Sequence, residues 1–178
     1  MTEAVDPLQF TGERFTPECV REIWYEHWHR YAFALDLARG KRVLDAACGE
    51  GYGSNLLAGV AAEVVGVDIS AEAISHARAR YQRDNLSFAT GDAAALTFSD
   101  QRFDLIVSFE TLEHLYEQEA LVAGFARMLA PSGVLLISSP DKRTYSEIAG
   151  FRNEFHVREL YREELMSLLG GHFPHIRL

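Results

Sequence analysis

The chain has 178 residues, of which 48% are hydrophobic and 24% are charged, and its net charge is −9. This length suits one domain with a single hydrophobic core, and the composition is neither that of a disordered nor that of a collagen-like chain. The negative charge disfavours nucleic acids and anionic lipids as partners, because both are themselves negatively charged. The basic run at residues 76–83 is interpreted as a solvated helix face.

Neither the cysteines nor the hydropathy indicate secretion or a membrane. Cys19 and Cys48 fit no metal-ligand spacing and are expected to be single thiols in a reducing compartment. No apolar run is long enough to be a transmembrane helix, and the acidic N-terminus does not resemble a signal peptide. We therefore expect a cytoplasmic protein without a membrane partner.

The first predicted element is an aromatic-rich helix that begins near Thr16, a residue type that commonly caps helices. Its apolar side chains recur every three or four residues. The large aromatic side chains are too many for one face: Trp24, Tyr25, Trp28 and Tyr31. Residues 1–39 are therefore predicted to form a lid over the ligand cleft or a protein interface, with Tyr25 and Trp28 facing the substrate. Simple packing against the sheet is the alternative.

Apolar runs alternate with amphipathic segments over the rest of the chain. Five runs are predicted to be strands, at residues 42–47, 62–70, 85–93, 103–110 and 133–140. Helices are predicted around residues 53–60, 70–83, 121–129 and 157–169, and a sixth strand is expected to begin at residues 173–178. Strands that are apolar throughout indicate a parallel sheet covered by helices on both faces. We therefore expect residues 40–178 to form one Rossmann-like, doubly wound α/β domain with a mostly parallel sheet.

Acidic residues lie at or just beyond the ends of four successive predicted strands: Asp45, Asp68, Asp92 and Glu110. A single aspartate at a strand end is often only a turn or cap residue. Because the carboxyl ends of parallel strands meet at one edge of the sheet, the four carboxylates are predicted to face one crevice. They would repel one another there unless the ligand is cationic or rich in hydroxyl groups.

The turn after the first strand distinguishes between two cofactors. It has glycines at positions 49, 51 and 53, whereas a dinucleotide-binding turn has the pattern G-x-G-x-x-G. Asp45 and Glu50 would oppose a pyrophosphate at this turn. S-adenosylmethionine has no phosphate and carries an ammonium, a sulfonium and a ribose diol, all of which suit carboxylates. The turn therefore favours S-adenosylmethionine, and a dinucleotide oxidoreductase is the disfavoured alternative.

Five segments resemble, in this order, the successive motifs of the class I S-adenosylmethionine-dependent methyltransferases: "VLDAACGEGYGS", "VVGVDIS", "GDAAAL", "FDLIVSFETLEHL" and "LAPSGVLLISSPD". The resemblance covers residues 40–142. It extends more weakly over residues 12–18 and 153–160, which are similar to a small-molecule branch of that family. It implies methyl transfer with S-adenosyl-L-methionine as cofactor and S-adenosyl-L-homocysteine as product.

The resemblance also implies how the cofactor is held. The methionyl part would be bound by Asp45, by Glu110 and by the backbone of Ala47, Gly49 and Gly51. The nucleoside part would be bound by Asp68 at the ribose hydroxyls, Ile69 on the adenine, Asp92 at the exocyclic amine and Ala93 through its N–H. For Ile69, an ordinary core position is the alternative.

Methyl transfer needs an aligned nucleophile, exclusion of water and, for some acceptors, removal of a proton. Glu110, His114 and His156 are the candidate catalytic residues, and His114 is the first candidate for a general base because the pKa of histidine lies near neutrality. The alternatives are a structural ion pair for His114 and helix capping for His156. Tyr145 and Phe155 are expected to form an aromatic wall beside the substrate. No metal-ligand set stands out.

The resemblance suggests that the acceptor is a hydroxyl group of a sugar or a related small metabolite. A second hypothesis is a binding module without catalytic activity that serves a neighbouring domain or partner. The family's sheet has seven strands, whereas this chain ends at residue 178, inside the predicted sixth strand. The C-terminal strands are therefore expected to be truncated, with the edge of the fifth strand covered by a neighbouring domain or a second copy.

Overall fold

One parallel sheet organises the molecule. The computed structural model describes residues 22–178, so the predicted helix start at Thr16 and the thiol of Cys19 lie outside the described residues. Five strands pair in the order β3-β2-β1-β4-β5, and every pair is parallel. They are β1 (Arg42–Ala46), β2 (Glu63–Asp68), β3 (Leu86–Thr90), β4 (Phe103–Phe109) and β5 (Leu129–Ser138). The predicted Rossmann-like α/β fold is confirmed.

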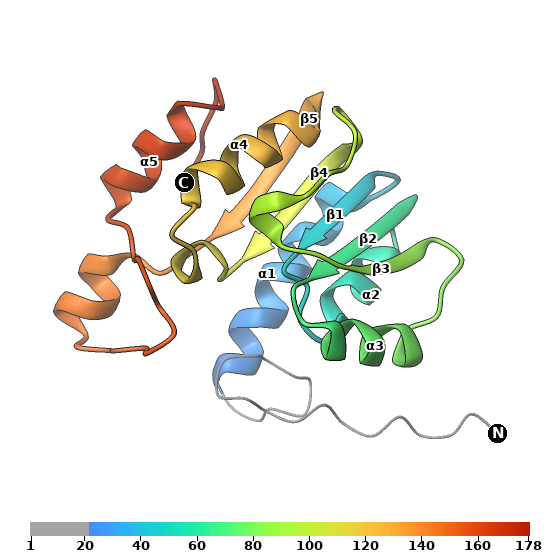
Figure 1. Ribbon diagram of the computed structural model, residues 1–178, viewed down its shortest axis with the longest axis horizontal. Helices are drawn as coiled ribbons and strands as arrows, with labels where there is room; N and C mark the ends of the chain where they lie inside the picture. Colours follow the sequence, from blue (N-terminus) through green and yellow to red (C-terminus); the bar gives the residue numbers. More distant parts are fainter. Residues whose placement is uncertain (1–21) are drawn as a thin grey trace.

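Helices cover both faces of this sheet (Figure 1). The helices are α1 (Glu22–Ala38), α2 (Tyr52–Ala58), α3 (Ala71–Arg80), α4 (Gln118–Met128) and α5 (Arg162–Gly170). Two single 3₁₀ turns are η1 (Ala93–Ala95) and η2 (Leu112–His114), and η3 (Arg143–Ile148) is a short π-helix. The cores of the two faces are distinct: α1 and α2 pack on one face, and α4 and α5 pack on the other. Among the described residues, no helix is long and apolar enough to cross a membrane.

The central strand shows why the apolar runs become strands covered on both faces. Successive side chains of a strand point to opposite faces. Val43 accordingly packs with α1 and α2, whereas Leu44 packs with α4, and both are fully buried. A run of apolar residues without polar alternation is therefore stable only in the middle of such a sheet.

The strand order reverses between β1 and β4. From β1 the chain proceeds to β2 and β3 on one side, and then returns to β4 and β5 on the other. In open α/β sheets, ligands bind at this reversal, outside the carboxyl ends of the strands. The fold therefore places the ends of β1 and β4, and the loops that follow them, at the expected ligand crevice.

Two predictions near the C-terminus are wrong. The helix predicted at 157–169 begins only at Arg162, because residues 157 and 158 bind through their backbone N–H groups to the carbonyl oxygen of Glu113. Residues 173–178 form no strand. Instead Phe173 and Ile176 pack as irregular chain against the core that includes α4 and α5, which partly buries their apolar side chains without a sheet partner.

The second half of α1 belongs to the core rather than to a detached lid. Tyr31, Ala34 and Ala38 are buried against β1, β4 and α2. The Tyr31 ring lies so close to α2 that a Cβ atom at Gly53 would be 2.0 Å from the Tyr31 Cζ atom. The third glycine of the turn is thus required for helix packing. A lid role for residues 1–39 stays a prediction.

We expect the Gly53→Ala variant to be less stable than the wild type by about 2–3 kcal/mol, because the added methyl group overpacks the contact with Tyr31. Urea unfolding followed by circular dichroism measures this loss. The matched control is Gly124→Ala in α4, where a Cβ meets nothing within 4 Å. This control should gain about 0.5–1 kcal/mol from helix propensity. Equal stabilisation of both variants would contradict the packing described for α1.

Candidate functional site

Asp45, in β1, is buried beneath the glycine turn and is held by two hydroxyl groups. It is 1% exposed. The Ser54 hydroxyl donates to Asp45 Oδ2 at 2.6 Å, and the Tyr31 hydroxyl lies 3.0 Å from Oδ1 and 3.2 Å from Oδ2. Burial raises the pKa of Asp45 to about 6, although both hydrogen bonds act in the opposite direction. Asp45 therefore connects α1, β1 and α2.

The raised pKa of Asp45 makes stability depend on pH. The folded chain binds the proton of the Asp45 carboxyl group more tightly than the unfolded chain does. The stabilisation that this proton gives the fold is therefore complete below about pH 4 and is lost as the pH rises through about 6. We expect Asp45→Asn to remove this loss, which amounts to about 3 kcal/mol at neutral pH. Urea unfolding of both proteins from pH 4 to pH 7 measures the difference.

Asp104 is a control of opposite sign for this measurement. Hydrogen bonds from Arg42 lower the pKa of Asp104 to about 2. The stabilisation that the ionised Asp104 carboxylate gives the fold is therefore present above about pH 4 and is lost as the pH falls through about 2. Asp104→Asn should lower stability throughout pH 4 to 7, with no gain relative to the wild type as the pH rises. A flat difference between Asp45→Asn and the wild type would contradict the assigned burial of Asp45.

The glycine turn adopts a left-handed backbone at three positions. Ala47 has φ 62°, Gly49 has φ 55° and Gly51 has φ 91°. A left-handed alanine is strained, and such strain concentrates at functional sites. A Cβ at Gly51 would lie 2.8 Å from the Ala77 Cβ atom and 2.9 Å from the Phe88 ring. Gly51 is therefore also required for the packing of α3 and β3 against the turn.

Glu50, in the same turn, points into the protein toward α3. It is 1% exposed. Its carboxylate is bound by the Tyr81 hydroxyl at 2.9 and 3.0 Å, by His76 Nε2 at 2.9 Å and by Arg80 Nη1 at 3.1 Å. The interpretation of Glu50 as a charge that opposes a phosphate is therefore wrong, because α3 neutralises it. Part of the basic run 76–83 likewise binds the turn and is not a solvated face.

Asp68 and Ile69 lie at the end of β2. Asp68 accepts the N–H of Gly49 at 2.8 Å and that of Ser70 at 2.9 Å. Each carboxylate oxygen keeps a further acceptor position. Ile69 is 74% exposed, although it is apolar and follows a buried strand. The alternative for Ile69, an ordinary core position, is therefore wrong, and its packing on an adenine stays a prediction. An exposed apolar side chain beside a hydrogen-bonding carboxylate suits a nucleoside.

Asp92 and Ala93 follow β3 at the same edge of the sheet. Asp92 is exposed and caps η1, since its Oδ1 atom accepts the N–H of Ala94 at 2.9 Å. Ala93 begins this turn. The four strand-end acids thus all have partners within the chain, and their repulsion does not by itself require a cationic ligand.

Glu110 follows β4 and has a left-handed backbone with φ 51°. Its N–H donates to the Ser138 carbonyl oxygen at 3.0 Å, and its Oε1 atom accepts the Ser138 hydroxyl at 2.7 Å. Arg30 Nη2 lies 3.3 Å from the same oxygen. Burial and the charge of Arg30 lower the pKa of His27 to about 4, whereas Glu110 opposes this change, so His27 is neutral at pH 7. These contacts connect β4, β5 and α1 at the ligand edge.

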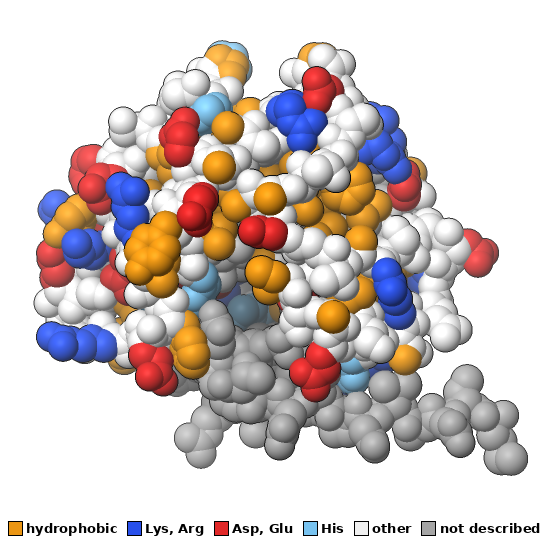
Figure 2. Space-filling model, in the orientation of Figure 1, with side chains coloured by type: hydrophobic (Ala, Val, Ile, Leu, Met, Phe, Trp, Pro, Cys, Tyr) orange, Lys and Arg blue, Asp and Glu red, His pale blue; other side chains and the backbone are white. Residues whose placement is uncertain are grey.

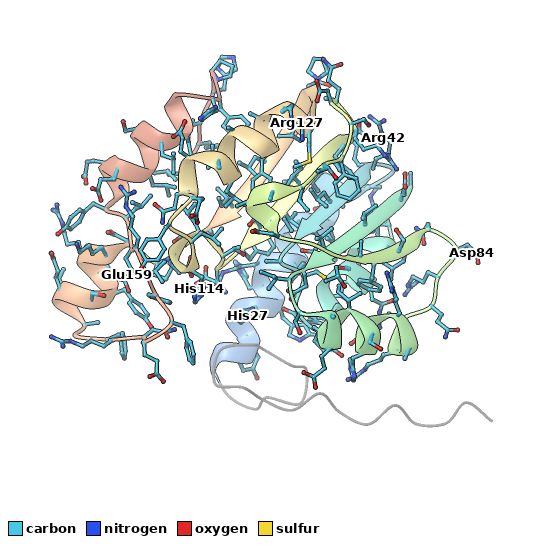
Figure 3. All side chains as sticks on the ribbon, in the orientation of Figure 1. His27, Arg42, Asp84, His114, Arg127 and Glu159 are labelled. Carbon is cyan, nitrogen blue, oxygen red and sulfur yellow. The ribbon has the colours of Figure 1, made fainter. Side chains whose placement is uncertain are left out.

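Glu113, His114 and His156 come together beside Glu110. Their ligand atoms lie within 4.8 Å of one another, and the two imidazole rings are 5.0 Å apart and nearly perpendicular. Burial, reinforced by the charge of Glu110, raises the pKa of Glu113. Figure 3 shows His114 and Glu159, which binds His156, on segments that approach one another in space. The two histidines predicted as catalytic candidates are thus brought to one place.

The predicted aromatic residues lie in different environments. Tyr25 is 70% exposed, whereas Trp28 packs on the Tyr52 ring at 5.7 Å. The Tyr145 ring is 5.4 Å from the His156 ring, and the Phe155 carbonyl oxygen accepts from His114. Tyr145 and Phe155 therefore both border the histidine cluster. The part of each in substrate binding stays a prediction.

Sequence reasoning missed the residues that hold the side chains of the site in place. They are Tyr31 and Ser54 at Asp45, Arg30 at Glu110, Ser139 at Glu113 and Glu159 at His156. Most of these partners are far away in the sequence, and a side-chain pair across the fold leaves no periodic pattern. Only Ser139 gave a signal, because it lies near the end of the strand predicted at residues 133–140.

Comparisons with known proteins agree with this geometry. A family model described as "Methyltransferase domain" matches residues 37–167. A protein of Mycolicibacterium smegmatis named as a probable S-adenosylmethionine-dependent methyltransferase is 39% identical over 165 residues, which cover 91% of this chain and 63% of the relative. A ubiquinone biosynthesis O-methyltransferase of Coxiella burnetii is 38% identical over 103 residues, which cover 57% of this chain and 44% of the relative.

Solved structures share the fold. The YcgJ protein of Bacillus subtilis matches with a TM-score of 0.73 and 26% identity, covering 82% of this chain and 68% of that protein. The chain spans less than two thirds of the length of both sequence relatives described above.

Proposed function

Because the chain belongs to the S-adenosylmethionine-dependent methyltransferases, we propose that it transfers a methyl group from S-adenosylmethionine to a hydroxyl group of a small molecule. The reaction would take place at the carboxyl edge of the sheet, between β1 and β4. The observation that carries the assignment of the cofactor is the pair at the end of β2, where a hydrogen-bonding carboxylate, Asp68, adjoins the exposed Ile69.

The chemistry of the edge suits this cofactor. Asp68 would accept the two ribose hydroxyls on acceptor positions that its backbone contacts leave open. Ile69 would cover the adenine, and Asp92 would accept the exocyclic amine through the oxygen that does not cap η1. The backbone of Ala47 and Gly49, which is left-handed, would bind the methionyl part next to Glu110. Asp45 would act on that part from beneath the turn.

The proposed acceptor is an oxygen atom. The Coxiella relative, which matches 57% of this chain, is named an O-methyltransferase. On the face shown in Figure 2, Lys and Arg side chains are scattered among Asp and Glu, and the described residues there form no continuous basic surface. Together with the net charge of −9, this distribution favours a small hydroxylated metabolite, such as a sugar derivative, over a nucleic acid as the acceptor.

The bond changes define what the chain must do. When bound, S-adenosylmethionine supplies a methyl group on a sulfonium; an oxygen–carbon bond forms, and the electron pair of the broken sulfur–carbon bond stays on sulfur. The chain must hold the hydroxyl in line with that bond and receive its proton. Glu113, His114 and His156 lie beside Glu110, where the methionyl end is expected. We assign the removal of the proton to this cluster.

The test is transfer of isotope-labelled methyl groups. The wild-type chain is incubated with methyl-labelled S-adenosylmethionine and a panel of hydroxylated metabolites that includes sugars and phenols. We expect stoichiometric S-adenosylhomocysteine and labelled methyl ether with at least one acceptor, and at least about 100-fold slower transfer by Asp68→Ala at limiting cofactor. Binding of S-adenosylhomocysteine without transfer to any acceptor would support the binding module instead.

A further inference from the structure

Three side chains beside the proposed acceptor site have the composition of a metal centre. Glu113 offers a carboxylate, and His114 and His156 each offer an imidazole nitrogen, all within 4.8 Å of one another. Ligands bound at about 2.1 Å to one tetrahedral ion lie about 3.4 Å apart. Small side-chain rotations therefore suffice to bring the three ligand atoms to that separation.

Each of the three side chains is held by a second group, as metal ligands usually are. Ser139 donates its hydroxyl to Glu113 Oε2 at 2.8 Å. The Phe155 carbonyl oxygen is 3.0 Å from His114 Nδ1, and the Glu159 carboxylate is 2.7 Å from His156 Nδ1. With Nδ1 donating in both rings, the lone pair of each ring is on Nε2. Glu159 is itself fixed by the Ser146 hydroxyl.

Glu113 carries the observation that points to a bound cation. Its side chain is 1% exposed, and among the residues that the structure describes its Oε1 atom has no hydrogen-bond partner. This oxygen faces His114, whose Nε2 atom is 3.9 Å away. A buried carboxylate oxygen without a hydrogen-bond partner is costly, and a cation in the cluster would remove that cost.

The backbone fixes the two halves of the cluster relative to each other. The N–H groups of Val157 and Arg158 both donate to the Glu113 carbonyl oxygen, at 2.9 and 3.0 Å. The Gln118 side chain donates to the carbonyl oxygens of Leu112 and Arg158, both at 2.8 Å. The loop that carries His156 is thus bound to the turn that carries Glu113 and His114, and the cluster is preorganised.

We infer that Glu113, His114 and His156 bind one divalent transition-metal ion. Two imidazoles and one carboxylate suit Zn²⁺, Co²⁺, Mn²⁺ or Fe²⁺ better than Mg²⁺ or Ca²⁺, which prefer oxygen ligands. Three protein ligands leave at least one position open. The role of the ion rests on the proposed function and specifies how the cluster would remove the proton: at the open position the ion would bind the acceptor hydroxyl and lower its pKa, so that solvent water takes the proton while both histidines serve as ligands.

The test measures metal binding directly on the wild-type chain. Co²⁺ is titrated in 1 mM Mg²⁺ and followed by its visible absorption, and Zn²⁺ then displaces it. We expect one equivalent of Co²⁺, displaced by one equivalent of Zn²⁺. Absence of a cobalt spectrum, or displacement of Co²⁺ by Mg²⁺ alone, would overturn the inference.

Variants identify the ligands. Glu113→Gln and His156→Gln should each weaken Co²⁺ binding at least about 100-fold, and Glu159→Gln should weaken it about 10–100-fold as a positioning residue. The matched control is His172→Gln, which removes a histidine paired with an exposed glutamate, Glu119, elsewhere on the surface. Unchanged Co²⁺ affinity in the cluster variants, or an equal loss of Co²⁺ affinity in His172→Gln, would also overturn the inference of a metal site. Binding of S-adenosylhomocysteine is measured separately on metal-free protein. Its absence would contradict the proposed function whether or not the metal ion binds.

Discussion

Asp68→Ala is expected to lower the affinity for S-adenosylhomocysteine at least 100-fold. Two hydrogen bonds from ribose hydroxyls to a carboxylate contribute about 3–5 kcal/mol together, and about 1.4 kcal/mol corresponds to a tenfold change in affinity. Isothermal titration calorimetry measures the loss. Asp68→Asn should show a smaller loss, because the amide oxygen still accepts one hydrogen bond.

The control for this prediction is Asp84→Ala. Asp84 is an exposed aspartate in the loop before β3, at the opposite end of that strand from the ligand edge (Figure 3). The Asp84→Ala variant should bind S-adenosylhomocysteine as tightly as the wild type does. Since Asp68 also accepts the N–H groups of Gly49 and Ser70, the unfolding of both variants is measured in parallel. Wild-type affinity in a folded Asp68→Ala variant would contradict the proposed role of Asp68.

Glu50→Ala is expected to destabilise the fold by about 3–5 kcal/mol. The buried carboxylate accepts from His76 and Tyr81 and pairs with Arg80, so its removal leaves buried polar groups without an acceptor. Urea unfolding measures the loss. Glu50→Gln should lose less than Glu50→Ala, because its amide oxygen retains one acceptor.

Glu119→Ala is the control that shows whether the loss of stability in Glu50→Ala comes from the burial of the carboxylate or only from its pairing with a histidine. Glu119 also pairs with a histidine, His172, but its side chain is 72% exposed. Exposed pairs contribute little, so this variant should remain within about 0.5 kcal/mol of the wild type. If Glu50→Ala lost no more than Glu119→Ala, Glu50 would not be the buried anchor of α3.

Much of the fold could be predicted because its signals are local. Unbroken apolar runs such as residues 103–109, bounded by polar residues, indicated parallel strands, and all five predicted strands formed. The start of the last helix could not be predicted, because Val157 continues the apolar spacing but its N–H binds the Glu113 carbonyl oxygen. A hydrogen bond between segments more than 40 residues apart has no local signal.

Part of the candidate site could also be predicted, for the same reason. The topology alone brings the ends of β1, β2, β3 and β4 to one edge, so Asp45, Asp68, Asp92 and Glu110 could be placed there. The direction of Glu50 could not be predicted, because the left-handed backbone at Gly49 and Gly51 on either side of it turns its side chain toward α3. The meeting of His156 with Glu113 and His114 depends on the loop after β5, whose path the sequence pattern did not indicate.

Titration of the wild-type chain with S-adenosylhomocysteine in a calorimeter tests most directly that this edge of the sheet binds the nucleoside of S-adenosylmethionine. We expect one molecule bound per chain, with NADH producing no comparable heat. Absence of binding at millimolar S-adenosylhomocysteine by the folded chain would contradict the assignment of Asp68, Ile69 and the glycine turn to this cofactor.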